Sequence, residues 1–268
     1  MTEKLIPKAI SSAEWEREKP ILPKCSYPHP PYHFRGQGIA LIYEIPYERV
    51  RGVIPNIFGP APGKGKIWFM VNFYNWGEFY PHADPSNKYQ FLEAYYKFSV
   101  DYSGKLGDYP IKLYLNSDMG IASGIELYGY PKYKAEMSYN LDDDGTNVSS
   151  GSFLIKRDDK IELEIVLKRA TGPIAKIMTM FANITAKSYL KQYVGNYLSP
   201  SVEDCKEFTF GQTRITKIRY DLAEVSRIYL REPVEWNILT EDEAAKPKYA
   251  FILTDTEADL DPPEVVKL

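Results

Sequence analysis

Short runs of aromatic and β-branched residues, each bounded by Gly, Pro, Asn or Asp, fill most of this chain. Residues of this kind favour strands, and the bounding residues favour turns. Strands spaced in this way are typical of an antiparallel barrel or sandwich. Seven such runs precede residue 170: Ile39–Ile45, Ile67–Tyr74, Gln90–Val100, Ile111–Asn116, Tyr133–Leu141, Val148–Lys156 and Ile161–Leu167. The sequence therefore predicts a mainly β (α+β) fold, with a hairpin turn at Asp158-Asp159.

Two stretches have helical periodicity instead. These are Tyr47–Val53 and a longer one from Pro173 to about Tyr193. Strand-like sequence then returns at Glu207–Arg231 and Lys248–Leu253. No Gly/Ser linker separates the halves, so we expect residues 35–268 to form one domain with a helical insertion near 172–195. Residues 1–34 carry six prolines and are expected to form an arm of the same domain, and the acidic tail 255–268 is expected to be loosely held.

Composition excludes several classes of protein. The chain is 44% hydrophobic and 26% charged, which suits a globular domain, and its formal charge of -3 gives no positive field for nucleic acid. No apolar run reaches the roughly 18 residues that a membrane span needs, and the first residues lack a signal core. We expect a soluble cytoplasmic protein without nucleic-acid or membrane partners. Cys25 and Cys205 are far apart and are predicted to be reduced thiols.

Other candidate sites are weak. His29 and His33 have the i,i+4 spacing of zinc ligands on a helix, but the prolines at 28, 30 and 31 oppose a helix there. His82 lies in a polar loop without a nucleophile motif around it. The run 59–66 lacks the spacing of a phosphate-binding loop, and the acidic runs 142–144 and 241–243 lack the ligand pattern of a calcium loop. No metal or cofactor is predicted.

Lys132 follows a rigid Tyr-Pro pair in the run Gly124–Lys134, among aromatic and aliphatic residues. Only the neutral amine of a lysine attacks a carbonyl, so a lysine that burial drives toward neutrality becomes a candidate for Schiff-base formation. Local context alone favours an exposed lysine at the start of a strand. The rest of the chain must therefore indicate whether Lys132 is a buried, reactive lysine or an exposed one.

The chain as a whole resembles the acetoacetate decarboxylase family. The resemblance is clearest from about residue 30 to 140 and rests on four anchors in order: Pro31-Tyr-His-Phe34, Val53-Ile-Pro55, Glu93 ahead of Gly107-Asp-Tyr109, and Gly124-x-Glu-Leu-x-x-Tyr-Pro-Lys132. It implies an antiparallel β-barrel or curved double sheet with a few decorating helices and a buried pocket. It also implies that Lys132 forms an imine with a β-keto acid substrate and releases carbon dioxide, without a cofactor.

The same resemblance implies further site residues. Glu93 and Glu126 match family carboxylates and are expected to position the substrate or transfer protons. Tyr130 and Tyr133 flank the lysine and are expected to line the substrate pocket. The family also has an N-terminal arginine that binds the substrate carboxylate. Two residues of this chain are candidates for its position: Arg35 directly follows the aromatic anchor, and Gln37 occupies the position in an alignment without gaps.

The chain departs from the family directly after the lysine, where Tyr133 replaces a second lysine. Acetoacetate decarboxylase is itself a standard example of a lysine activated by desolvation or by a neighbouring cation. Burial alone shifts a lysine pKa by about 3–5 units, so desolvation can activate an amine without that second lysine. In an extended segment Tyr133 points away from the face of Lys132, whereas Lys134 shares it.

Three functions remain open at this stage. A Schiff-base lyase that decarboxylates a β-keto acid is the leading prediction. An aldolase-dehydratase that uses the same imine is the second, because Gln37 stands where an arginine is expected. A barrel that binds a small molecule without catalysis is the third, because Tyr133 replaces a lysine. The 22 tyrosines and the proline-rich arm also favour a homo-oligomer.

Overall fold

The structure, a computed structural model, describes residues 28–143, 148–186, 191–195 and 207–267. Cys25 and Cys205, predicted as reduced thiols, lie outside these ranges. Strands dominate the described part of the chain: β1 (Tyr32–Pro46), β2 (Gly59–Pro60), β3 (Pro62–Gly63), β4 (Lys66–Pro81), β5 (Tyr89–Tyr102), β6 (Lys105–Leu115), β7 (Lys132–Lys134), β8 (Glu136–Asp143), β9 (Val148–Arg157), β10 (Lys160–Arg169), β11 (Lys191–Gly195), β12 (Glu207–Leu230), β13 (Tyr249–Leu260) and β14 (Glu264–Lys267). The mainly β prediction is confirmed.

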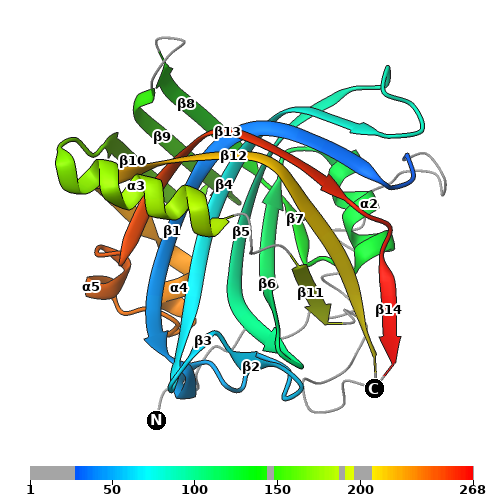
Figure 1. The fold of residues 1–268 in the computed structure, drawn as a ribbon, viewed down its shortest axis with the longest axis horizontal. Helices are drawn as coiled ribbons and strands as arrows, with labels where there is room; N and C mark the ends of the chain where they lie inside the picture. The colour runs from blue at the N-terminus through cyan, green and yellow to red at the C-terminus, as the bar shows by residue number, and fades with distance from the viewer. Residues whose placement is uncertain (1–27, 144–147, 187–190, 196–206, 268) are drawn as a thin grey trace.

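One large mixed sheet contains these strands, with its long strands in the order β11-β6-β5-β4-β1-β13-β12-β10-β9-β8. Most neighbours are antiparallel, whereas β7 and β11 pair with β6 in parallel. β11 also pairs with β12. The long strands curve around the interior of the molecule (Figure 1). Helices decorate this sheet: η1 (Tyr47–Arg49), α2 (Asp118–Tyr128), α3 (Pro173–Ala186), α4 (Arg231–Glu235) and α5 (Glu241–Ala244).

The sheet separates two hydrophobic cores, because successive side chains of a strand point to opposite faces. On β5, Ala94, Tyr96 and Phe98 pack into the larger cluster, here called the main core, with members from β1, β4, β9 and β10. The alternate residue Phe91 packs into a second cluster, here called the helix-side core: Tyr32, Trp76, Phe79, Phe91, Leu113, Leu115, Ile121, Ile125, Tyr128, Tyr130 and Leu260. Each face of β5 is therefore buried against a different set of partners.

The predicted strand runs are confirmed, except that Tyr133–Leu141 spans two strands, β7 and β8, and the observed strands are mostly longer than the runs that predicted them. In β9, Phe153 and Ile155 are buried while Ser152 and Lys156 are exposed, as the alternation predicted. The β9–β10 turn is at Asp158-Asp159, where both residues have positive φ. β1 begins at Tyr32, so the last residues assigned to the N-terminal arm belong to the sheet.

Three expectations need correction. The helix predicted from Pro173 to about Tyr193 ends at Ala186, because residues 191–195 pair as a strand with β12. The tail predicted to be loosely held contains the end of β13 and β14, which pair with β12. The helix predicted over Tyr47–Val53 is a single 3-10 turn, η1, followed by further turns.

Helix α2 is the longest element that the sequence did not predict. The Ser117 side chain caps it by accepting a hydrogen bond from the Gly120 N–H, and Gly129 ends it in the left-handed conformation, with φ of 69°. Ile121 and Ile125 bury its inner face in the helix-side core. None of the described helices has the length and apolar character that a membrane span requires.

Candidate active site

Lys132 opens β7 immediately after Pro131 and lies on the helix-side face of the sheet. Its backbone is fixed by the parallel pairing of β7 with β6, in which Lys132 is the partner of Leu113. Although it is a lysine, it is only 7% exposed. Its Nζ donates hydrogen bonds to Glu93 Oε1 at 2.9 Å and to the Gly120 carbonyl oxygen at 3.0 Å. The side chain is thus buried with an anionic partner from β5 and a backbone partner from α2.

Two glycines of α2 contact this lysine, one by leaving space for its side chain and one through its carbonyl oxygen. A Cβ atom on Gly124 would lie 2.2 Å from Lys132 Cε and 2.6 Å from its Nζ, far inside van der Waals contact. Gly120, one helical turn earlier, supplies the carbonyl that the ammonium group contacts. The lysine side chain therefore lies directly against the helix backbone, and the site requires a glycine at position 124.

Glu93 is the centre of the hydrogen bonds around the lysine. It is 2% exposed, and each of its carboxylate oxygens has a partner. Oε1 accepts from Lys132, and Oε2 accepts from Trp76 Nε1 at 3.0 Å and from the Tyr95 hydroxyl at 2.5 Å. A carboxylate with this many donors is held in a single orientation, because burial makes an unpaired charge costly.

Aromatic rings enclose the pair. Lys132 Nζ lies 5.5 Å from the centre of the Tyr130 ring, and Trp76 stacks on Tyr74 with ring centres 4.5 Å apart. Burial raises the pKa of both Tyr95 and Tyr130, and the charge of Glu93 raises each further. Both phenols therefore stay protonated at neutral pH, and the Tyr95 hydroxyl donates a hydrogen bond to Glu93.

A second buried ion pair lies on the same face of β5. Lys97 Nζ donates to Asp108 Oδ2 at 2.7 Å, and the Ser99 hydroxyl donates to the other oxygen of that carboxylate at 3.4 Å. Glu93, Tyr95 and Lys97 occupy alternate positions, so their side chains project to one side of the strand. The interior on this side therefore carries two opposite-charge pairs separated by a phenol.

Tyr133 points to the opposite face, as predicted, and packs in the main core. Its ring lies 4.3 Å from Lys112 Nζ and 4.9 Å from the Arg157 guanidinium carbon. Lys134, two positions after Lys132, also contacts α2, through Asp118 at 2.8 Å. The residue that replaces the family's second lysine is therefore in a different environment from Lys132, and the cations against its ring are Lys112 and Arg157.

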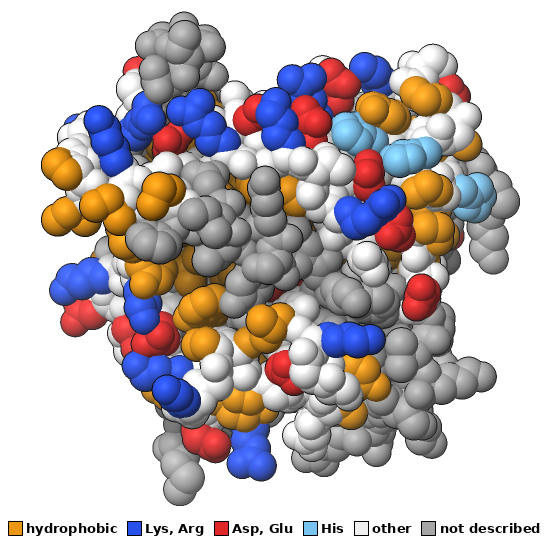
Figure 2. Space-filling view, viewed as in Figure 1, with side chains coloured by type: hydrophobic (Ala, Val, Ile, Leu, Met, Phe, Trp, Pro, Cys, Tyr) orange, Lys and Arg blue, Asp and Glu red, His pale blue; other side chains and the backbone are white. Residues whose placement is uncertain are grey.

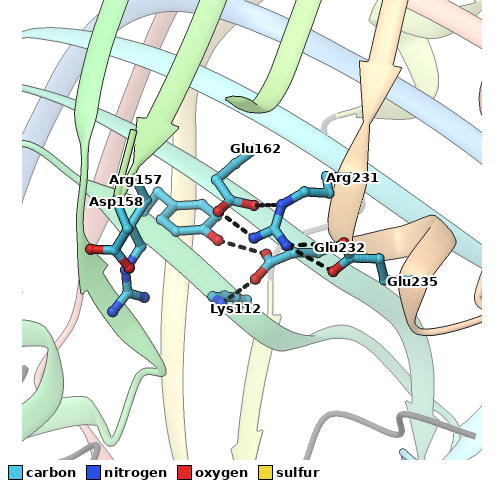
Figure 3. A network of polar contacts seen from close by, with 8 residues as sticks. Lys112, Arg157, Asp158, Glu162, Arg231, Glu232 and Glu235 are labelled. Atoms are coloured by element: carbon cyan, nitrogen blue, oxygen red, sulfur yellow. Dashed lines mark hydrogen bonds and ion pairs between the residues drawn. The ribbon is translucent and has the colours of Figure 1, made fainter. Parts of the chain in front are cut away.

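Lys112 belongs to a polar network on the face of the sheet that carries the main core (Figure 3). Its Nζ is 2.5 Å from Glu232 Oε1, and the Tyr114 hydroxyl donates to Glu232 Oε2 at 2.6 Å. Arg231 forms a two-point contact with Glu162, which raises the pKa of the guanidinium group. Burial raises the pKa of Glu162 in spite of that contact. The network ties α4 to β6 and β10.

Besides Tyr133, three predicted site residues do not join Lys132. Glu126 lies on the exposed side of α2, two residues after Gly124, so it points away from the lysine. Arg35 is 53% exposed and pairs with Glu257 at 3.4 Å. Gln37 donates to the Thr254 carbonyl and accepts from the Tyr139 hydroxyl. The structure brings together Lys132, Glu93 and Tyr130, and it places Glu126, Arg35, Gln37 and Tyr133 elsewhere.

Sequence reasoning missed Trp76, Tyr95 and the glycines of α2 as site residues. Tyr95 was within reach of the pattern, because it stands two positions after Glu93 in a predicted strand and so shares its face. Gly120 and Gly124 have the i,i+4 spacing of one helix face. The contact of Trp76 with Glu93 could not be predicted from the sequence around Trp76, because it depends on the register of β4 against β5.

The geometry places a buried primary amine beside a buried carboxylate with neutral phenol donors around them. Transfer of one proton from Lys132 to Glu93 gives a neutral amine and a neutral acid, so no net charge is left in the interior. A neutral amine is a nucleophile toward a carbonyl group, and the acid is then in place to return the proton.

Known proteins resemble this chain in sequence. The acetoacetate decarboxylase (ADC) family profile matches residues 19–180. A curated acetoacetate decarboxylase from Burkholderia vietnamiensis is 28% identical over 158 residues, which are 55% of this chain and 60% of the relative. One from Burkholderia cenocepacia is 26% identical over a match with the same shares. The matched region therefore spans less than two thirds of these relatives.

Solved structures resemble this chain in fold. Acetoacetate decarboxylase from Legionella pneumophila has a TM-score of 0.61 at 16% identity, over 90% of this chain and 89% of that one. The enduracididine biosynthesis enzyme MppR, solved with pyruvate, has a TM-score of 0.59 at 12% identity, over 90% and 91% of the two chains. The profile covers more than half of the chain and the fold agrees with it, so the chain belongs to the acetoacetate decarboxylase family.

Proposed function

We propose that this protein decarboxylates a β-keto acid through an imine on Lys132. The observation that carries the proposal is the contact of Lys132 Nζ with Glu93 Oε1 at 2.9 Å, in an interior where both residues are buried. A lysine in water stays an ammonium ion and is not a nucleophile. A lysine that has a proton acceptor within hydrogen-bond reach, and no water shell, meets the requirements of Schiff-base chemistry.

The reaction proceeds in balanced steps. The neutral Lys132 amine adds to the ketone carbon, and loss of water from the carbinolamine gives a protonated imine. The carbon–carbon bond to the carboxylate then breaks, carbon dioxide leaves, and the electron pair moves onto the imine nitrogen to give a neutral enamine. Protonation of the enamine carbon restores an imine. Water hydrolyses this imine, which frees the ketone product and the lysine amine.

Glu93 supports several of these steps. It accepts the proton that Lys132 must lose and donates a proton to the departing carbinolamine hydroxyl. Its second oxygen stays fixed by Trp76 and Tyr95 throughout. Tyr130, whose ring faces Lys132 Nζ, is a donor for an oxygen of the bound substrate. Glu126 has no part in this scheme, because it lies on the exposed side of α2.

Aldol condensation followed by dehydration is the second candidate. It uses the same imine and enamine, but the enamine carbon attacks an aldehyde instead of taking a proton. The observation that favours it is the placement of Arg35 and Gln37, neither of which contacts Lys132 or Glu93. MppR, which shares the fold, has also been solved with the condensation product of pyruvate and imidazole 4-carboxaldehyde.

Borohydride trapping tests the proposal. The full chain is incubated with a panel of β-keto acids, each imine is reduced with sodium borohydride, and the modified peptide is mapped by mass spectrometry. We expect an adduct on Lys132. Lys97 and Lys112 are internal controls, because both are ion-paired and have side chains only 10% and 12% exposed, yet are given no chemical role. Carbon dioxide release without an aldehyde identifies the decarboxylase, and aldehyde consumption without carbon dioxide identifies the aldolase.

A Glu93→Gln variant separates the role of the carboxylate from that of the pocket. Glutamine keeps an oxygen that accepts from Trp76 and Tyr95 but cannot take a proton, so imine formation should slow by roughly 10²–10⁴-fold. The absence of an adduct on Lys132 with every keto acid in the panel contradicts the proposal. Equal labelling of Lys97 and Lys112 contradicts it too, because the site would then have no special reactivity.

A further inference from the structure

A row of acidic side chains runs along one face of β13 and continues past its end. Asp255, Glu257, Asp259 and Asp261 occupy alternate positions, while Thr256, Ala258 and Leu260 between them are buried. The pleat of a strand therefore places all four carboxylates on one side. The row lies between β1 and β12, the two neighbours of β13 in the sheet.

Three of these carboxylates face permanent cations. Lys217 pairs with Asp255 at 2.6 Å, Arg35 pairs with Glu257 at 3.4 Å, and Arg214 pairs with Asp261 at 3.3 Å. Asp259 differs, because its partners are two imidazole rings. In Figure 2 the histidine side chains gather on one face, next to acidic and basic side chains. Asp259 is therefore the carboxylate of this row whose partners are imidazole nitrogens, which can bind a metal ion, whereas the other three carboxylates pair with ammonium or guanidinium groups.

The two histidines converge on one oxygen atom of Asp259. His33 Nδ1 lies 3.0 Å and His82 Nε2 lies 3.1 Å from Asp259 Oδ1. The three ligand atoms all lie within 4.8 Å of one another. A zinc ion held at about 2.0–2.2 Å from nitrogen and oxygen ligands spaces them about 3.4 Å apart in a tetrahedron. The two distances to Asp259 Oδ1 are close to that spacing.

The backbone holds these side chains in place. His33 and Asp259 are direct partners in the β1–β13 register, and His33 stacks on Tyr80, its partner on β4, with ring centres 4.8 Å apart. The backbone N–H of His82 donates a hydrogen bond to the backbone carbonyl of Pro31 at 2.9 Å, which fixes the turn after β4 against the start of β1. The ligands come from three segments that are already fixed together, and His82 is 40% exposed, so an ion can enter.

We propose that His33, His82 and Asp259 bind a divalent transition-metal ion of the zinc class. Two imidazoles and one carboxylate are a common ligand set for such ions and a poor one for Mg²⁺ or Ca²⁺, which prefer all-oxygen sites. The bound ion joins the start of β1, the turn after β4 and the end of β13. It acts on folding and not on the Lys132 chemistry, because the hydrogen-bond partners of the two sites are different residues.

Thermal unfolding of the chelator-treated full chain with added Zn²⁺ tests this proposal. A ligand that binds only the folded state stabilises it by RT ln(1 + L/Kd), where L is the concentration of free ligand, so the unfolding midpoint rises with that concentration. We expect a rise with added Zn²⁺ that does not occur with Mg²⁺, and a binding titration that gives one ion per chain. Co²⁺ at the same site should give the intense visible absorption bands of a tetrahedral ion, which hydrated Co²⁺ lacks.

Variants identify the ligands. His82→Asn and His33→Gln should each weaken Zn²⁺ binding at least about tenfold, since even outer-shell partners of a metal are worth about 10–100-fold. Asp84→Asn is the matched control, because Asp84 is an exposed carboxylate in the same turn that accepts from Ser86 and not from a histidine. The proposal is wrong if Zn²⁺ leaves the midpoint unchanged, if Mg²⁺ acts equally, or if Asp84→Asn weakens binding as much as His82→Asn.

Discussion

At the scale of single residues, Lys132 combines burial with an ion pair to Glu93. The sequence suggested that Lys132 owes its reactivity to burial, since Tyr133 replaces the second lysine of the family. Lys132 is indeed buried, but it is buried against Glu93 and not in an apolar pocket. A paired carboxylate offers the proton a place to go, which burial by itself does not. Tyr133 is therefore compatible with the proposed chemistry.

The contact between Gly124 and Lys132 gives a sharp test at this scale. In Gly124→Ala the new methyl group would lie 2.2 Å from Lys132 Cε, so the lysine side chain must leave its place against α2. We expect borohydride trapping at Lys132 to fall by at least about tenfold, with a loss of unfolding free energy of about 1–3 kcal/mol from overpacking. Peptide mapping and urea unfolding measure the two effects.

Gly59→Ala is the control for this substitution. A Cβ atom on Gly59 meets its nearest neighbour at 3.8 Å, an ordinary contact, and Gly59 is on β2 and not on α2. Trapping should stay unchanged in this variant. If Gly124→Ala traps a keto acid as fast as the unaltered chain, the position of Lys132 against the helix has no role in its reactivity.

At the scale of elements, the sheet could be predicted and its closest contacts could not. Alternation of apolar and polar residues in Val148–Lys156 predicted the correct buried face of β9, because successive residues of a strand point to opposite faces. Helix α2 was missed because its glycines lower helix propensity and nearly all its residues are apolar or small, so no polar face marks the period. β13 was predicted to end at Leu253, because the acidic residues that follow it, such as Asp255 and Glu257, are typical of an exposed tail.

The same limit applies to the candidate site. Lys132, Glu93 and Tyr130 came from the family resemblance and lie together in the structure. Trp76 reaches Glu93 only because β4 and β5 pair in one particular register, and His33, His82 and Asp259 meet across a sequence separation of 226 residues. Pairings of this kind depend on the register of strands, which local patterns do not report.

Helix α5 gives a pH-dependent prediction for an element. A capping box joins Thr240 and Glu243, and Arg49 donates to Glu243 Oε2 at 2.6 Å. The Arg49 hydrogen bond, helped by the Thr240 N–H, lowers the pKa of Glu243 below 4.5. A lowered carboxyl pKa stabilises the folded state above the unfolded value, and this stabilisation is lost as the pH falls through the folded value.

We therefore expect Glu243→Gln to be less stable than the unaltered chain above about pH 4.5, and the difference to shrink on acidification. Thr240→Ala, which removes only the cap, should lose about 0.5–2 kcal/mol at neutral pH. Urea unfolding at a series of pH values measures both. A difference between Glu243→Gln and the unaltered chain that grows toward pH 3 would contradict the assigned sign.

At the scale of the whole molecule, the curved sheet keeps two charged interiors apart. Lys132 and Glu93 lie with the helix-side core, and the network of Lys112, Glu232 and Arg231 lies with the main core (Figure 3). Consecutive residues of β7, Lys132 and Tyr133, contribute to opposite sides. The geometry thus separates the residues assigned to chemistry from those that join α4 to the sheet.

Lys112→Met tests this separation. The substitution leaves the Glu232 carboxylate buried without its cation, so the unfolding free energy should fall by about 3–5 kcal/mol. Trapping at Lys132 in the folded protein should persist, because Lys112 is on the other face. Lys66→Met is the control, since Lys66 pairs with Glu44 at the exposed surface and should change stability little. Loss of trapping in folded Lys112→Met would mean that the two interiors are coupled.

The carbonyl of Gly120 has a consequence for how the molecule would release its product. A lysine ammonium has three N–H donors, and Lys132 uses two of them on Glu93 and on Gly120. A protonated imine has only one. An imine or enamine formed on Lys132 would therefore leave at least one of these two acceptors without its lysine donor, and hydrolysis would restore both bonds. The helix that makes room for the lysine would thus also disfavour a permanently modified lysine.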